Sequence, residues 1–203
     1  MKLRRQITTR RGREAGMSLI ELMIAMVVLV VGMMGVMILI TTAIASNNRN
    51  KLDTTATAIS QMVIERIAAQ SAFTVQNCST QTSVPCVRVQ DCRPASAGGP
   101  QTWAVATAGA AAPGAGALIN NATGNIDFTQ QYAAVPANYK MEFVSCGAAG
   151  QQATYDVRWN VRTITGFSKL VTVSTRQIGA TAGGPGSLKL FVPPVTLRTI
   201  AGM

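Results

Sequence analysis

The chain has no histidine, few aromatic side chains and little charge for its 203 residues. Histidine is the usual general base and the partner of the nucleophile in Ser-His and Cys-His sites, so those catalytic arrangements are excluded. There is no phosphate-binding loop, dinucleotide fingerprint or paired-carboxylate motif, and no helix pattern follows the glycine-rich turn at Gly183–Gly186. The sequence therefore predicts neither an enzyme nor a cofactor site.

Acidic residues are also scarce, numbering only 8 in the whole chain. Glu142 and Asp156 fall on the polar positions of predicted strands, where side chains are normally solvated, and we expect both to be exposed. The carboxylates beyond the N-terminal segment show no catalytic spacing; they are Asp53, Glu65, Asp91, Asp127, Glu142 and Asp156.

Charge is absent from one long stretch, Leu22–Ile40, in which every residue is apolar or glycine. Crossing about 30 Å of hydrocarbon takes about 20 such residues, so this stretch predicts a membrane-spanning helix. Residues 1–16 carry six Lys and Arg against Glu14. The positive-inside rule then keeps this leader in the cytoplasm and places everything after Ile40 outside.

The boundary between leader and apolar run reads Gly16-Met17-Ser18-Leu19-Ile20-Glu21. With a basic leader before it, this motif resembles the processing site of type IV prepilins and type II secretion pseudopilins. In that family a prepilin peptidase cuts after the glycine and methylates the new N-terminus. The resemblance implies that Gly16 precedes the cut, that Met17 becomes the methylated residue, and that Glu21 matches the family's glutamate.

Glu21 also needs a physical explanation, because a charge inside an apolar membrane segment is costly and usually functional. A buried carboxylate is tolerated when it is paired. Cleavage after Gly16 would create an α-amino group nearby, on the same chain or on a neighbour in a filament. Pairing between neighbours would fix the axial register of the helices. The alternative is a lone glutamate favoured by the helix dipole or the headgroup region.

Glycine and proline are both absent between Val36 and Val84, so nothing breaks a helix predicted from about Met17 to about Ala69. Its second half carries one apolar stripe at helical spacing, suited to packing on a domain. The stripe consists of Leu52, Ala56, Ile59, Val63 and Ile67.

Three later runs alternate apolar and polar residues and predict an antiparallel sheet with one buried face. They are Tyr139–Cys146, Tyr155–Arg162 and Leu170–Arg176. Leu188–Val192 is a candidate edge strand, stopped by the two prolines that follow it. Because the sheet and the helical stripe each need a partner, we expect an α+β fold with the long N-terminal helix packed on a C-terminal antiparallel sheet. This is also the pilin-like fold that the resemblance implies.

Four segments follow from these patterns: a leader at 1–16, a helix at 17–71 with its transmembrane part at 17–41, a loop region at 72–130 and a sheet-bearing head at 131–203. Within the loop region, Val84–Val89 is a candidate short strand, and the Ala/Gly-rich residues 107–116 predict a mobile surface loop.

Four cysteines, Cys78, Cys86, Cys92 and Cys146, all follow the membrane segment and would lie in an oxidising compartment. Without histidine, and with seven and five residues between the first three, they do not resemble a zinc site. We therefore expect disulfides. Four cysteines allow three full connectivities, and the sequence does not choose among them.

The run Val28–Gly35 resembles the corresponding stretch of PilV-type minor pilins. We therefore expect a minor structural subunit of a type IV pilus, with prepilin peptidase and other pilin subunits as partners. It would enter the inner membrane with its head in the periplasm and then join a filament at the cell surface. The alternatives are a type II secretion pseudopilin and a membrane-anchored module that binds a surface or DNA. The net charge of +10 is weak support for DNA, because the leader carries much of it and no aromatic-basic interleaving occurs.

Overall fold

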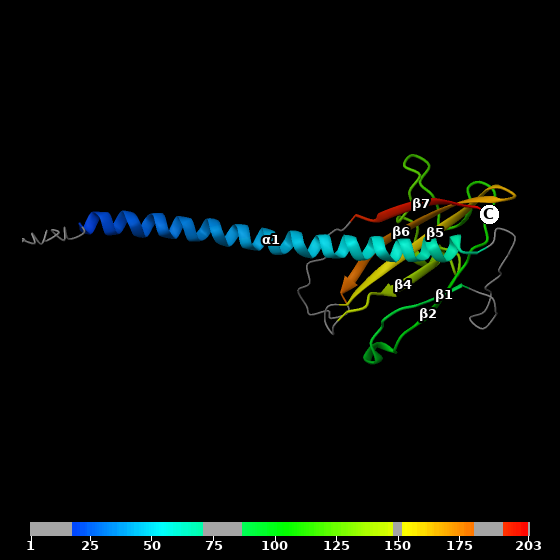
Figure 1. Ribbon diagram of the computed structural model, residues 1–203, viewed down its shortest axis with the longest axis horizontal. Coiled ribbons are helices and arrows are strands. Elements are labelled where there is room, and N and C mark those ends of the chain that lie inside the picture. The colour runs from blue at the N-terminus through cyan, green and yellow to red at the C-terminus, as the bar shows by residue number, and fades with distance from the viewer. Residues whose placement is uncertain (1–17, 71–86, 148–151, 181–192, 203) are drawn as a thin grey trace, which may run out of the picture. The chain divides into compact units, whose positions relative to one another are not determined.

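The computed structural model describes residues 18–70, 87–147, 152–180 and 193–202 (Figure 1). The chain divides into two compact units, residues 1–47 and 48–203. The predicted long helix is confirmed as α1, Leu19–Ala68, which contributes to both units. The second unit contains β1 (Val87–Gln90), β2 (Thr102–Val105), β3 (Ala115–Gly116), β4 (Lys140–Val144), β5 (Ala153–Thr165), β6 (Ser168–Ala180) and β7 (Val195–Gly202), with 3-10 turns η1 (Ala95–Ala97) and η2 (Tyr132–Ala134).

The main sheet of the second unit is antiparallel, with strand order β3-β5-β6-β7. β5 and β6 form a long hairpin in which Thr165 pairs with Ser168 across a two-residue turn. β4 and β3 share the other edge of β5, where they pair with residues 154–158 and 160–161. All three predicted strands are therefore confirmed, and β5 and β6 are longer than their alternating patterns.

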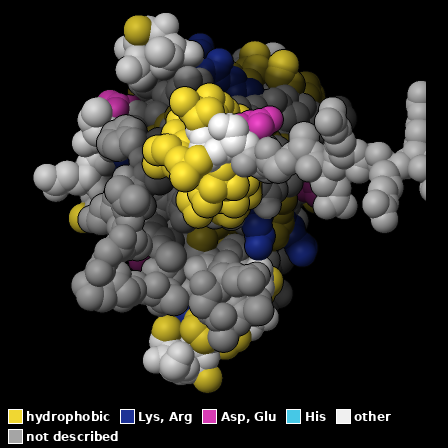
Figure 2. Space-filling view, turned by 90° about the vertical axis from the view of Figure 1, so that its left-hand side faces the viewer, with side chains coloured by type: hydrophobic (Ala, Val, Ile, Leu, Met, Phe, Trp, Pro, Cys, Tyr) yellow, Lys and Arg dark blue, Asp and Glu magenta, His cyan; other side chains and the backbone are white. Residues whose placement is uncertain are grey.

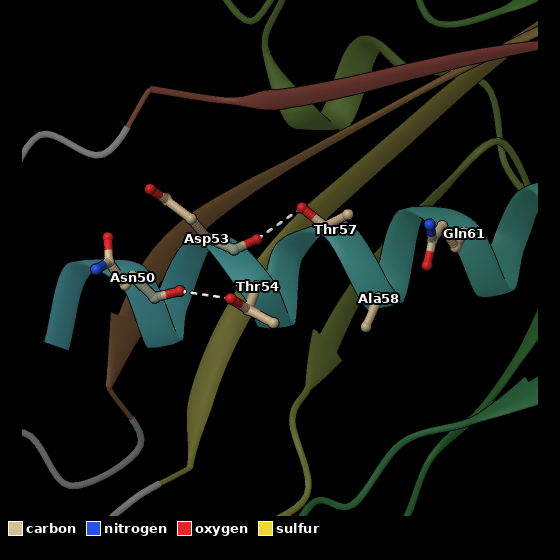
Figure 3. Close-up of a pocket in the computed structure, with 6 residues that line it drawn as sticks. All are labelled: Asn50, Asp53, Thr54, Thr57, Ala58 and Gln61. Carbon is tan, nitrogen blue, oxygen red and sulfur yellow. Dashed lines mark hydrogen bonds between the residues drawn. The ribbon is translucent and has the colours of Figure 1, made fainter. Parts of the chain in front are cut away.

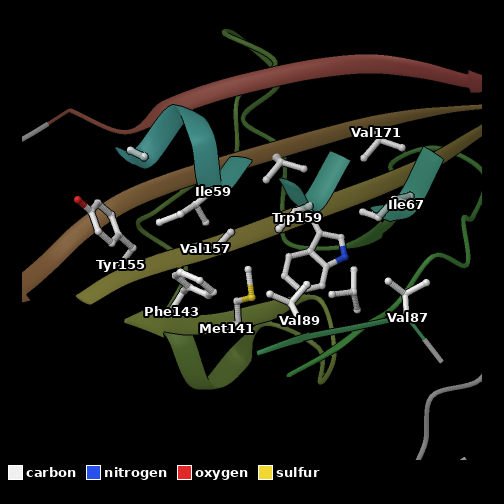
Figure 4. Close-up of a cluster of buried hydrophobic side chains, with 14 of the residues drawn as sticks. Ile59, Ile67, Val87, Val89, Met141, Phe143, Tyr155, Val157, Trp159 and Val171 are labelled. Atoms are coloured by element: carbon white, nitrogen blue, oxygen red, sulfur yellow. The ribbon is translucent and has the colours of Figure 1, made fainter. Parts of the chain in front are cut away.

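The stripe predicted on α1 is also confirmed. Ala56, Ile59, Val63 and Ile67 are buried, and Leu52 packs against them. They share one hydrophobic cluster with the apolar residues of β4, β5 and β6 (Figure 4). Burying one such side chain contributes roughly 1.5–3 kcal/mol, so this cluster is the main source of stability in the second unit. The α+β fold, with a helix packed on an antiparallel sheet, follows from it.

β1 and β2 form a separate two-stranded ribbon whose valines complete this cluster (Figure 4). The chain after β1 is fastened to β4, because the Cys92 backbone N–H donates to the Val144 carbonyl at 3.1 Å. Part of the candidate strand at Val84–Val89 is confirmed as β1, while residues 84–86 lie outside the described residues.

The Ala/Gly-rich residues 107–116 are more ordered than the sequence predicts. They contain β3, and Ala110 bridges to Arg162 further along β5. A Cβ on Gly116 would collide with the Trp159 carbonyl, and the φ of +112° at Gly116 also favours glycine. The small residues therefore allow this segment to lie against the edge of β5.

The last described strand follows the two prolines. β7 starts at Val195 and pairs along its whole length with β6. The candidate edge strand Leu188–Val192 lies outside the described residues and stays a prediction. The alternation of apolar and polar residues in β7 covers only residues 195–198, because the adjacent polar residues Arg198 and Thr199 break it, which explains why the sequence gives only a weak strand signal there.

Candidate functional site

The N-terminal part of α1 exposes an apolar surface. Its large hydrophobic residues between Leu19 and Ile40 are each at least 49% exposed. This is the one described helix that is long and apolar enough to cross a membrane. Figure 2 shows hydrophobic side chains gathered around it. Such a surface suits hydrocarbon or other apolar helices, because a water-exposed patch of this size is rare in proteins without a partner.

Glu21 lies in the first turn of α1. The Ser18 carbonyl begins the helix by accepting hydrogen bonds from the N–H groups of Glu21 at 3.0 Å and Leu22 at 3.2 Å. At this end the helix dipole favours a negative charge. No ion pair involves Glu21 among the described residues. Its position in the first turn therefore suits a negative charge.

Ser18 precedes the first residue of α1 and has a role that was not predicted from the sequence. A serine that precedes a helix, with glutamate three residues later, has the spacing of a capping box. This spacing is visible in the sequence and predicts where α1 begins. Gly16 and Met17, the predicted cleavage and methylation residues, lie outside the described residues.

Residues 11–37 match the prokaryotic N-terminal methylation motif. The matched residues include Gly16, Met17, Glu21 and most of the apolar run. The match supports the resemblance to prepilins and pseudopilins over this segment, and membrane anchoring through the same helix. Comparison with curated proteins and with solved structures finds no match. The second unit is therefore interpreted from its own residues.

A shallow groove of about 420 Å³ lies along one face of α1, between Asn50 and Gln61 (Figure 3). Its hydroxyl groups are already used, since Thr54 and Thr57 donate to the carbonyls of Asn50 and Asp53, each at 2.8 Å. Asp53 is the one titratable residue among its described lining residues. The described residues also contain no group of three or more potential metal ligands. We therefore assign no reaction to the groove.

Asp156 corrects a prediction, because it is buried and not solvated. Its carboxylate accepts hydrogen bonds from Arg158 at 2.7–3.1 Å, and Arg176 lies 3.4 Å away. Arg158 also donates to the Gln130 carbonyl at 2.6 Å. The sequence correctly assigns Asp156 to the polar side of β5, but residues 117–135 cover that side. Glu142, on β4, is partly exposed.

Cations and aromatic rings alternate in space on this covered side. Phe128 has the guanidinium groups of Arg158 and Arg176 at 4.9 and 4.5 Å from its ring centroid. Tyr132 is contacted by Arg158 at 5.7 Å and by Lys140 at 4.7 Å. Burial raises the pKa of Tyr132, and the negative charges of Glu142 and Asp156 raise it further. The phenol therefore stays neutral, and the stack holds residues 128–132 against the sheet.

The sequence gives no sign of this stack, because the rings and the cations lie in different parts of the chain. Contacts of this kind contribute roughly 0.5–2 kcal/mol each. Arg158 is held by a carboxylate and a carbonyl, so the stack is a structural clamp and offers little to a ligand.

Cys92 and Cys146 form a disulfide with a Cα–Cα distance of 4.9 Å. This confirms part of the disulfide prediction and agrees with one of the three connectivities. Cys78 and Cys86 lie outside the described residues. Next to Cys92, the buried carboxylate of Asp91 accepts a hydrogen bond from the Gln101 N–H at 2.6 Å and so closes the loop between β1 and β2.

Proposed function

We propose that the chain is a minor structural subunit of a type IV pilus. The observation that carries this proposal is the methylation-motif match at residues 11–37, on a helix whose N-terminal part is apolar and exposed. Prepilin peptidase cleaves after Gly16, and Met17 becomes the methylated N-terminus. The function is then assembly, in which apolar helices leave lipid and pack against those of other pilin subunits. The resemblance of Val28–Gly35 to PilV-type proteins favours a minor subunit.

Glu21 sets the register of this assembly in the proposal. Cleavage after Gly16 places a new α-amino group four residues before Glu21, about one helical turn away. Away from water, a carboxylate and an ammonium group each need a partner. The pair forms within one chain or between neighbouring chains, and the second arrangement fixes one helix axially against the next.

The proposed segments follow from this processing. The leader, residues 1–16, stays in the cytoplasm and is removed. Residues 17–41 anchor the chain in the inner membrane and later lie in the filament. The sheet-bearing head, residues 131–203, lies in the periplasm before assembly and at the cell surface after it.

Intact mass and N-terminal analysis of the protein from its native membrane test the processing step. We expect loss of residues 1–16 and a methylated Met17. Retention of the leader in cells with an active prepilin peptidase would refute the proposal and favour a membrane-anchored binding module. Cleavage beyond Ile40 would instead identify an ordinary secretion signal.

Glu21→Gln tests the register role separately. It removes the charge but keeps the shape, so cleavage should continue while recovery of the protein in filaments falls about tenfold or more. Glu65→Gln is the matched control, since Glu65 is an exposed carboxylate on the same helix. Equal losses for the two variants would argue against a special role for Glu21.

A type II secretion pseudopilin is the second candidate, because the N-terminal motif suits both groups. Deletion of the gene distinguishes them. Loss of surface pili with normal protein secretion supports a pilus subunit, whereas loss of secretion with normal pili supports a pseudopilin.

A further inference from the structure

We propose that the outer edge of β7 binds an extended strand of another subunit of the same filament, one with neutral or acidic side chains. This inference rests on the proposed function, because the filament supplies the partner. All eight residues of β7 pair with residues 168–175 of β6. The described chain places no strand on the other side of β7, which lies at one border of the sheet (Figure 1).

The two borders of the sheet differ in how their backbone groups are used. At the opposite border, β3 and β4 cover β5. Beyond β4, the chain adds a Cys92 N–H bond to the Val144 carbonyl and an Ala106 N–H bond at 2.8 Å to the Asn138 carbonyl. In β7, by contrast, alternate residues direct N–H and C=O groups away from β6. These groups can accept a further strand.

β7 also has few of the features that normally prevent edge strands from pairing. Such strands are commonly short, bulged, or interrupted by proline or charged residues, lysine above all. β7 contains neither proline nor lysine, and its pairing with β6 has no register shift, although the pairing of β5 with β6 has two. Its one charge, Arg198, is held by the Thr123 carbonyl at 3.1 Å and Asn125 Oδ1 at 2.8 Å. Ile200 is 67% exposed.

The side chains at this border define the chemistry of the partner. β7 carries one charge, the exposed cation Arg198, and no Asp or Glu, and the guanidinium is held by neutral oxygen atoms, so a neutral or acidic strand is favoured over a basic one. Ile200 is exposed on one face of β7, while Val195 and Leu197 are partly exposed on the other. Apolar residues on both faces of the added strand would cover them. Backbone hydrogen bonds then supply affinity, and these contacts supply specificity.

Hydrogen exchange measured by mass spectrometry tests this inference with the full-length chain. The protein is compared in detergent micelles and in filaments isolated from cells. We expect the outward amides of β7 to exchange at least about tenfold more slowly in filaments. The turn between β5 and β6 should exchange equally in both, because no strand covers it.

A pair of matched variants sharpens the result. Ile200→Lys places a charge on the edge strand and should lower both the protection of β7 and the recovery in filaments about fivefold or more. Ile164→Lys is the control, since Ile164 is also exposed, at 51%, but lies outside β7 near the end of β5. It should leave both measurements unchanged.

Equal exchange of β7 in micelles and filaments would overturn the inference, as would equal losses for the two variants. The exchange comparison on the unmodified chain decides the question even if Ile200→Lys does not fold. Failure of the proposed function gives a different result, namely a retained leader or absence of the unmodified chain from filaments.

Discussion

The two sides of β5 are buried equally but by different chemistry. Each residue from 155 to 161 is at most 4% exposed. The side that faces α1 is apolar and packs on the helical stripe; it consists of Tyr155, Val157, Trp159 and Val161. The other side is polar and lies under residues 117–135; it consists of Asp156, Arg158 and Asn160. An alternating strand can therefore be buried on both sides when a covering segment supplies hydrogen-bond partners.

These two sides should respond differently to mutation. Truncating an apolar side chain loses transfer free energy and leaves a cavity. Removing one member of a buried ion pair leaves its partner charged and unpaired, which is more costly than replacing both members. The main prediction is therefore an asymmetry between single and double variants on the polar side.

Asp156→Ala should have the largest effect, lowering the free energy of unfolding by about 4 kcal/mol because Arg158 and Arg176 lose their carboxylate. Thermal unfolding of the full-length chain in micelles, followed by tryptophan fluorescence, measures it. The double variant Asp156→Leu/Arg158→Met should lose only about 1 kcal/mol, since the buried Arg158 charge is removed together with its partner and the Arg176 side chain is one-third exposed to water. If the double variant loses as much as the single one, the polar side is not held by this pair.

Removal of the disulfide should have the second largest effect on the free energy of unfolding, because the disulfide fastens the β1–β2 ribbon that completes the apolar cluster. Cys92→Ala/Cys146→Ala opens a loop with a sequence separation of 54 residues. The expected loss is about 3 kcal/mol, since an unlinked unfolded chain has more conformational entropy. The same unfolding measurement applies, and mass spectrometry of the remaining cysteines checks that no new disulfide forms. A loss below about 1 kcal/mol would mean that packing of the ribbon suffices without the disulfide.

The sequence predicts the apolar side of β5 well, because period alone determines it. The alternation places Trp159 on the same face of β5 as the second residue on either side of it. The spacing of Ile59 and Val63 places them on one face of α1. Each pattern predicts an apolar face that must be covered, and the two faces can cover each other. The helix, the sheet and their packing are therefore predictable. The role of Glu21 also comes from the sequence alone, because a charge inside an apolar run usually indicates function, and it stays a prediction.

The polar side could not be predicted, because its cover comes from a segment with no periodic pattern. Phe128 lies 30 residues before Arg158 in the sequence, and only the folded chain brings the ring and the guanidinium together. The small residues around Gly116 look like low complexity, although close contact with β5 explains them. For the same reason, Asp156 follows a pattern that normally indicates exposure and is nevertheless buried.

Lys169 is the reverse case of Asp156, because it is a charged residue buried on the apolar side of the sheet. It lies on the same face of β6 as Val171 and Val173, and it is 6% exposed. Its Nζ donates to the Thr107 carbonyl at 3.3 Å, and it takes part in no ion pair within the described part of the chain. Burial lowers the pKa of Lys169, because it disfavours the charged form.

Lys169→Met should therefore have the smallest effect and the opposite sign, raising the free energy of unfolding by about 1 kcal/mol at pH 7. Above the lowered pKa, folded Lys169 releases its proton while the unfolded chain keeps it until about pH 10.5. The unmodified chain then gains stability relative to the variant, so the difference should shrink as the pH approaches 10.5. Melting temperatures at pH 7 and pH 10 measure this.

Lys140→Met is the control, because Lys140 is partly exposed and donates to the Tyr132 carbonyl at 2.7 Å. If Lys169→Met destabilises the head at pH 7, the bond to Thr107 outweighs the cost of burying the charge, and the apolar side accepts a cation as readily as the polar side does.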